Sequence, residues 1–315
     1  MTFTHCATVL SEAFGRALGG VIHKFKTLRD VGFNTFAKMY DTAVTSVSDY
    51  AAEIWGYKDF PVCNNIQNRA MRYYLGVHRF APIVGMQGDF GWLSPRYRRF
   101  KCILNFWNRL ICMSNNRLTK HVFTYDYQEC YNNWSADIKR ICEILNIVDV
   151  FDNFIPADKQ NVIENLVKLN KQEWLENVHN KPKLRTYVLF KREFSLENYI
   201  KYHMHKRKRS LLSQFRLGIL PLRIETGRYD NTPVNNRLCK LCVLNAVEDE
   251  YHFVMTCPLY VNFRLNLFQK AAQMYENFGE INDINKFKFL VEKCYKPLSQ
   301  FIYDSYERRQ RSLFN

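Results

Sequence analysis

One short segment of this 315-residue chain constrains its folding more than any other. Cys239, Cys242, His252 and Cys257 follow the spacing C-x2-C-x9-H-x4-C. Zinc prefers four sulfur and nitrogen ligands in a tetrahedron, and a gap of two residues lets both cysteines bind one ion. His252 and Cys257 lie about one helical turn apart, so a short helix or tight loop can present both. The spacing therefore predicts a zinc knuckle, whose folding depends on its metal.

The ligand set predicts a structural site rather than a catalytic one. Three thiolates and an imidazole fill the coordination sphere, whereas a hydrolytic zinc keeps a position open for water. Chance is the alternative, because ten cysteines and eight histidines can produce one such cluster. Against chance, the other seven cysteines are scattered singly. The nine-residue gap carries Glu248, Asp249 and Glu250, which suit an exposed loop.

The composition indicates a folded protein. A hydrophobic content of 47% and an aromatic content of 15% are untypical of disordered chains. No apolar run approaches the roughly 18 residues that span a bilayer, so we expect no membrane partner. The N-terminal residues lack the charged, apolar and small-residue regions of a secretory signal. We therefore expect an intracellular protein, nuclear or cytoplasmic, whose thiols stay reduced.

Apolar residues recur at steps of three and four, which predicts a mainly α fold with only short strands. Helices are expected over 36–54, 61–75, 95–111, 135–145, 163–178, 196–217, 263–274, 287–294 and 298–306. Ser94-Pro95 and Ser135 are the expected start signals of two of them, and 85–91 and 149–156 are expected loops. The punctuated segment 177–182 predicts a domain boundary, which gives a helical region 1–180 and a second region 181–315.

The net charge of +15 is unevenly distributed. Residues 1–120 carry a net charge of +9, residues 121–180 carry −5, residues 181–229 carry +10 and residues 230–315 carry +1. Two basic blocks are the electrostatic pattern expected where a polyanion is held through its phosphates. The alternative is a solvated basic surface that aids solubility.

The second basic block contains the run Lys206, Arg207, Lys208 and Arg209, and Arg216 extends it. Such a run can neutralise phosphates or serve as a nuclear localisation signal, and a solvated helix face is the alternative. We favour phosphate contact because further basic residues surround the run.

Catalytic signatures are absent from the sequence. There is no nucleophile elbow, no H-E-x-x-H motif and no adjacent pair of aspartates. Two-metal phosphoryl transfer needs clustered carboxylates to hold its ions. We therefore expect no enzyme activity and no small-molecule substrate.

Several segments resemble the C-terminal part of the reverse transcriptase-like proteins of non-LTR (LINE-type) retrotransposons. The similar segments are TLRDVGFNTFAKMYDTAV, YAAEIWGY, IQNRAMRYYLGVHRFAP, GDFGWLSP, FWNRLICM, NKPKLRTYVLFK, RSLLSQFRLGILPLRIETGRY and LCKLCVLNAVEDEYHFVMTCPLY. The resemblance covers most of residues 8–313, and the Cys-His segment is its most specific part. One departure is Ala51, which stands where relatives usually have glycine in YGxEIWG. A modest helical preference would explain it.

The resemblance implies a thumb-like helical region over 1–180, followed by a basic helical linker, a CCHC zinc-binding region and terminal helices over 181–315. The family's polymerase motif, Tyr/Phe-Ala-Asp-Asp, and its endonuclease carboxylates are missing here. The chain then resembles a truncated or split product, and a separate palm-containing polymerase chain stays open as a partner.

Three hypotheses follow. In the first, the chain is a non-catalytic fragment that binds RNA or DNA, with Arg98, Arg99 and Lys101 on template or primer phosphates. The run Lys206 to Arg209 would then hold RNA or target DNA. In the second, it is a structural or protein-interaction zinc module from a decayed element with no nucleic-acid role. The third, an active polymerase, is the least favoured because no palm-like aspartate pair is present.

Overall fold

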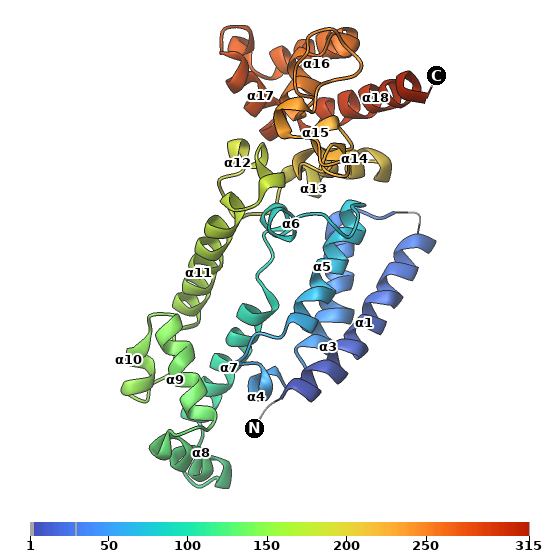
Figure 1. Cartoon of the computed structure of the whole chain (residues 1–315). Helices are drawn as coiled ribbons and strands as arrows, with labels where there is room; N and C mark the ends of the chain where they lie inside the picture. The colour runs from blue at the N-terminus through green and yellow to red at the C-terminus, as the bar shows by residue number, and fades with distance from the viewer. Residues whose placement is uncertain (1–2, 29, 315) are drawn as a thin grey trace. The chain divides into compact units, whose positions relative to one another are not determined.

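The computed structural model describes residues 3–28 and 30–314, and it confirms the predicted mainly α class (Figure 1). No strand forms in these two ranges, and Leu238 and Val247 make an isolated antiparallel bridge. The helices of the first half are α1 (Thr4–Thr27), α2 (Phe33–Tyr40), the π turn η1 (Asp41–Thr45), α3 (Ser46–Ser48), α4 (Ala52–Trp55), α5 (Pro61–Leu75), α6 (Ile83–Phe90), α7 (Pro95–Ile111), α8 (Leu118–Glu129), α9 (Trp134–Ile144), α10 (Val148–Asp152) and α11 (Lys159–His179).

The second half consists of shorter elements until the last two helices. They are η2 (Pro182–Leu184), α12 (Tyr187–Phe190), α13 (Asn198–Lys201), α14 (Lys206–Arg216), α15 (Arg223–Thr226), η3 (Val234–Asn236), η4 (His252–Thr256), η5 (Pro258–Tyr260), α16 (Val261–Met274), η6 (Glu276–Gly279), α17 (Asp283–Glu292) and α18 (Tyr295–Phe314). Among the helices described, none is both long and apolar enough to cross a bilayer.

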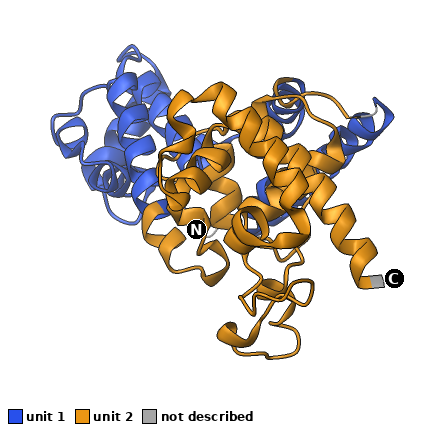
Figure 2. Cartoon of the chain, turned by 90° about the horizontal axis from the view of Figure 1, so that it is seen from above, with its two compact units in different colours: residues 1–29, 35–70, 92–174 blue, residues 30–34, 71–91, 175–315 orange. Residues whose placement is uncertain are grey.

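The chain forms two compact units that are not continuous in sequence (Figure 2). Unit 1 comprises residues 1–29, 35–70 and 92–174, and unit 2 comprises 30–34, 71–91 and 175–315. The predicted boundary near residue 180 lies close to the last of these divisions. The segments 30–34 and 71–91 belong with the C-terminal unit, which the sequence pattern does not indicate.

Unit 1 is built around Trp107 of α7. Its indole N–H donates to the Ile155 carbonyl at 2.9 Å, and its ring stacks on Phe151 at a centroid distance of 5.7 Å. The helix that carries it begins as predicted, because the Ser94 hydroxyl accepts from the Tyr97 N–H and Pro95 occupies the first turn. The predicted Ser135 cap is wrong, since Asn133 caps α9 by accepting from the Ala136 N–H.

The single helix predicted over 36–54 is interrupted at Ala51. Its backbone has φ 51° and ψ 25°, the left-handed conformation that glycine adopts without a steric penalty. Another residue there costs about 1–2 kcal/mol. The expectation that a helical preference explains Ala51 is therefore wrong, because this position favours the glycine that it lacks.

The loop predicted over 85–91 is also wrong, since α6 covers most of it. A Cβ at Gly85 would lie 2.6 Å from the Leu217 side chain and 2.9 Å from that of Leu184. Glycine is thus needed here because the Leu184 and Leu217 side chains pack against its backbone, and not because of a turn. Gly91, at φ 62°, ends α6.

A buried ion pair occupies the interior of unit 2. Asp89 and Arg216 are both inaccessible to solvent, and the Arg216 Nη2–Asp89 Oδ1 distance is 2.9 Å. The hydroxyls of Tyr187 and Tyr199 donate to the same carboxylate at 3.0 and 2.8 Å. Burial alone would raise the pKa of Asp89, but the Arg216 charge and these hydrogen bonds hold that pKa below its usual value. Asp89 is therefore ionised, and hydrogen bonds from protein groups replace the water around its carboxylate.

Replacing Asp89 with asparagine should destabilise unit 2 by up to about 3–5 kcal/mol, because the buried Arg216 loses the carboxylate that it binds through two hydrogen bonds and keeps only Glu197, at 3.0 Å. Urea unfolding, with hydrogen exchange of the α14 amides, measures the loss. The matched control is Arg140→Gln, which breaks an exposed Arg140–Asp137 pair and should cost less than about 1 kcal/mol. Equal losses for the two variants would contradict this assignment.

Candidate metal centre

Two cysteines of the predicted cluster lie on a short ribbon. The Cys239 N–H donates to the Ala246 carbonyl at 2.8 Å, and the Glu248 N–H donates to the Arg237 carbonyl at 3.0 Å. The ribbon turns back on itself through Asn245, whose φ is 47°. The ligand atoms of Cys239 and Cys242 thereby lie within 4.8 Å of each other.

The other two residues come from η4, a single π turn. The Asp249 carboxylate accepts from the His252 N–H at 2.7 Å and so caps this turn. The Cys257 N–H then donates to the His252 carbonyl at 2.9 Å, across five residues. One wide turn therefore holds His252 and Cys257 close to each other.

The four side chains converge. Their ligand atoms all lie within 4.8 Å of one another, and the Cys242 Sγ–His252 Nε2 distance is 3.5 Å. Metal–ligand bonds of about 2.0–2.3 Å in a tetrahedron require ligand separations of this order. Cys239, His252 and Cys257 are buried and Cys242 is half-buried. These four residues are therefore close enough to hold a metal ion.

Groups next to the ligands orient the His252 ring and stabilise the thiolate forms of the cysteines. The Thr256 hydroxyl lies 2.9 Å from His252 Nδ1, which leaves Nε2 directed at the sulfurs. The backbone N–H groups of Leu241, Leu244 and Leu259 act to lower the pKa values of Cys239, Cys242 and Cys257 respectively. Each donor lies two residues after its cysteine, and such bonds stabilise thiolates.

The cysteine side chains of the cluster also interact with one another. Donation of a hydrogen bond to Cys257 raises the pKa of Cys239 to about 12, with burial adding to the rise. The same bond lowers the pKa of Cys257, and burial raises that of Cys242. A metal ion bound here would displace the Cys239 proton.

Two carboxylates between the ligands fix this segment within unit 2. Glu248 accepts from Arg309 of α18 through both oxygens, at 2.9 and 2.8 Å. Glu250 accepts from Arg185 at 2.6 Å and from the Thr186 hydroxyl at 2.8 Å. The prediction of an exposed acidic loop is therefore wrong for both glutamates, which are buried. The sequence gives no signal of this, because their cationic partners lie some 60 residues away in both directions.

Three of the residues predicted to contact phosphate have side chains that are buried and paired within the chain. Arg99 donates to the Gly56 and Lys58 carbonyls and lies over the Trp55 ring. Arg209 pairs with Asp30 at 2.6 Å, and Arg216 pairs with Asp89. A phosphate cannot reach a guanidinium that is enclosed in this way.

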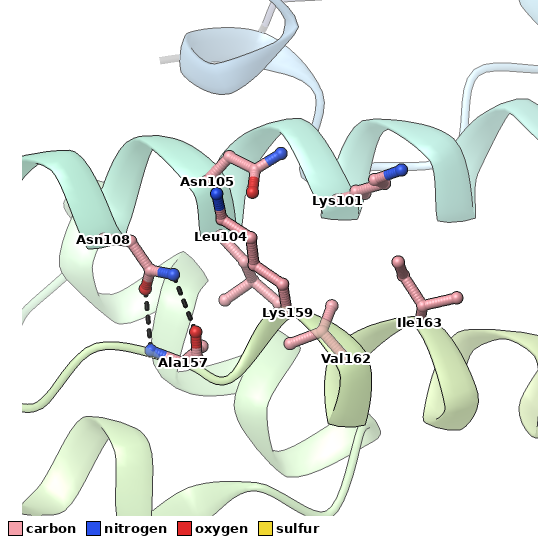
Figure 3. A pocket seen from close by; sticks show the side chains of 8 residues that line it. All are labelled: Lys101, Leu104, Asn105, Asn108, Ala157, Lys159, Val162 and Ile163. Carbon is pink, nitrogen blue, oxygen red and sulfur yellow. Dashed lines mark hydrogen bonds between the residues drawn. The ribbon is translucent and has the colours of Figure 1, made fainter.

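The other two predicted phosphate contacts of residues 1–120, Arg98 and Lys101, differ in exposure. Arg98 is mostly buried and binds Asp49 at 2.7 Å, so its charge is neutralised within unit 1. Lys101 is exposed on α7 and lines a cavity of about 260 Å³ together with Lys159 and Val162 (Figure 3). Lys101 is therefore the one residue of this group whose ammonium is accessible to an anion.

The basic run keeps three accessible cations at the start of α14. Lys206 and Arg207 are exposed, and Lys208 is half-buried. Arg207 lies 3.7 Å from Glu307 in an exposed pair, and Lys208 donates to Gln300 at 2.6 Å. These contacts are at the surface and leave the three charges open to water.

Much of the second basic block is neutralised inside unit 2, which charge counting does not reveal. Besides the exposed Arg207–Glu307 pair, seven of its thirteen cations form ion pairs with carboxylates of the same unit; they are Lys183, Arg185, Lys191, Arg209, Arg216, Arg223 and Arg228. Of the thirteen, Lys191, Arg209 and Arg216 are buried, so the block is partly structural and partly a surface.

Comparison with known proteins adds no relative: no protein-family model, curated protein or solved structure matches this chain.

Metal affinity should rise with pH, because binding converts the protonated Cys239 thiol to thiolate. We expect an increase of about tenfold per pH unit for each proton released, between about pH 6 and 8. Competition with a chromophoric chelator measures it. Cys112→Ser, which removes an exposed thiol outside the cluster, should leave the slope unchanged, and an affinity independent of pH would contradict the assignment.

Proposed function

We propose that this chain is a non-catalytic module that binds one structural zinc ion and nucleic acid. The observation that carries the proposal is the convergence of Cys239, Cys242, His252 and Cys257 within 4.8 Å. The family resemblance supports a place for it as the C-terminal part of a non-LTR retrotransposon reverse transcriptase-like protein. In that place a palm-containing polymerase chain would be its protein partner.

The donor set favours zinc over other ions. Three sulfurs and one imidazole suit a borderline-soft cation, whereas magnesium and calcium prefer oxygen ligands. Four protein ligands complete a tetrahedron and leave no position for a reactive water, which supports a structural role. The ligand segment is also bound to α18 through Glu248 and Arg309, so an ion here would stabilise more than its own loop.

Nucleic-acid binding is supported by the charges that stay accessible. An internal ion pair removes one charge of each sign, so pairing leaves the net charge of +15 unchanged. Lys206, Arg207 and Lys208 begin α14, and its first turn carries no acidic residue. The positive end of the helix dipole adds to their field, and an anion is favoured at such a place.

The second candidate is a structural or protein-interaction module without a nucleic-acid role. The seven internally paired cations favour it, because they show that basic residues of this block serve the fold. Both candidates share the metal site, so nucleic-acid titration at low salt separates them.

Elemental analysis of the purified chain should give one zinc ion per molecule. Cys242→Ser should lose most of it, because a hydroxyl is a poor ligand for zinc, and cobalt substitution should give the visible spectrum of a tetrahedral thiolate site. Cys112→Ser should keep its zinc. Equal metal contents in the two variants would contradict the site.

Replacing Lys206, Arg207 and Lys208 with alanine should reduce the slope of log K against log salt concentration by up to about 2–3, since three phosphate contacts are lost. Filter binding over a salt series measures the slope. The matched control removes three exposed cations from the acidic segment, Lys139, Arg140 and Lys168, and should change it less. Absence of saturable binding at low salt would favour the second candidate.

A further inference from the structure

Helix α8 is attached to unit 1 through one face only. Phe123 packs its ring on Trp107 at a centroid distance of 5.3 Å. The Lys120 ammonium reaches the end of α7 and donates to the Leu110 and Ile111 carbonyls at 3.0 and 2.9 Å. These contacts hold α8 beside α7 and α9 (Figure 1) and fix which of its residues face outward.

The outward face carries an apolar line. Leu118, Val122 and Tyr125 are 78%, 59% and 65% exposed, and they follow one another at steps of four and three. That spacing places them along one side of the helix. Apolar anchors in this arrangement are how a helix binds another helix or a groove, and a solvated helix usually carries polar residues there.

The charges at the two ends of α8 oppose its own dipole. Arg117, at the N-cap, and Glu129, the last helical residue, are both exposed. The first turn has no acidic residue and the last turn no basic one. The positive end of a helix favours anions and the negative end favours cations, so both end charges are unfavourable for α8 alone.

We propose that α8 pairs antiparallel with α8 of a second copy of this chain, across a two-fold axis near Val122. This arrangement places Leu118 of one copy against Tyr125 of the other and the two Val122 side chains together. Arg117 then approaches Glu129 of the second copy with an axial offset of about 4.5 Å, which an arginine side chain spans. Each end charge thereby meets both an opposite charge and the favourable end of a helix dipole.

The surroundings favour a protein over nucleic acid on this face. Residues 121–180 carry a net charge of −5, and the one lysine of α8, Lys120, is buried against carbonyl groups. A phosphate backbone would meet Glu129 and few cations here. The positive charge at one end of α8 and the negative charge at the other complement each other in an antiparallel pair. The protein partner is therefore a second copy of this chain.

The small area of this interface makes the pairing weak. A helix of 12 residues is about 18 Å long, and a single apolar line covers less than the roughly 1,000 Å² of a stable interface. The dimer should therefore form with rising protein concentration and dissociate on dilution.

Sedimentation velocity on the full chain over a range of concentrations tests the proposal. We expect the average mass to rise from monomer towards dimer, and Val122→Glu to keep the monomer at every concentration because it places two carboxylates at the axis. The control is Leu265→Glu, a change at a residue of α16 that is 56% exposed, which should dimerise like the parent. Circular dichroism confirms that both variants are folded.

A charge exchange gives the second test. Arg117→Glu and Glu129→Arg should each weaken association by about three- to tenfold, and the double variant should restore it to within about twofold of the parent. Each single change improves the match of α8 to its own dipole, so unfolding of α8 cannot explain the loss. A monomer at all concentrations, or a double variant no better than the singles, would overturn the proposal. A monomer whose nucleic-acid affinity falls on Val122→Glu would overturn it in favour of a nucleic-acid surface.

Discussion

The carboxylate of Asp89 has no access to water. The arrangement of unit 2 depends on the protein groups that donate hydrogen bonds to this carboxylate in place of water. A buried charge is tolerated only when paired and hydrogen-bonded, so the chain must bring donors to it. They come from α12, α13 and α14, through Tyr187, Tyr199 and Arg216. Three short segments that could each pack in several ways are thereby held in one arrangement around α6.

The same constraint determines how the metal-ligating segment is held. Glu248 and Glu250 stand between two ligand pairs, and each is buried against an arginine from another part of unit 2. The ribbon and the π turn are therefore attached at two points besides the ligands themselves. These attachments do not involve the ligand atoms, so they hold the ribbon and the turn in place independently of the four ligand side chains.

Local signals in the sequence predicted local features well. Ser94 with Pro95 marked a true helix start, and the Cys-His spacing marked residues that do converge. Prediction failed where a distant contact decides the outcome. The sequence pattern places Gly85 in a loop because its packing partners, Leu184 and Leu217, are 99 and 132 residues away and leave no local signal. Arg209 was expected at the surface because its neighbours are basic, yet Asp30, 179 residues earlier, neutralises it within the interior.

Arg209 also shows how a basic run should be interpreted. Four adjacent cations on a helix cannot share one face, since successive residues are turned by about 100°. One of them points inward in α14 and finds a carboxylate there, while Lys206 and Arg207 stay exposed. Such internal pairs are electrically neutral, so they change where the charge lies without changing its sum. The net positive charge of the chain therefore resides on its accessible lysines and arginines. The nucleic-acid hypothesis requires these side chains to contact phosphates, whereas the structural hypothesis requires only that water solvates them.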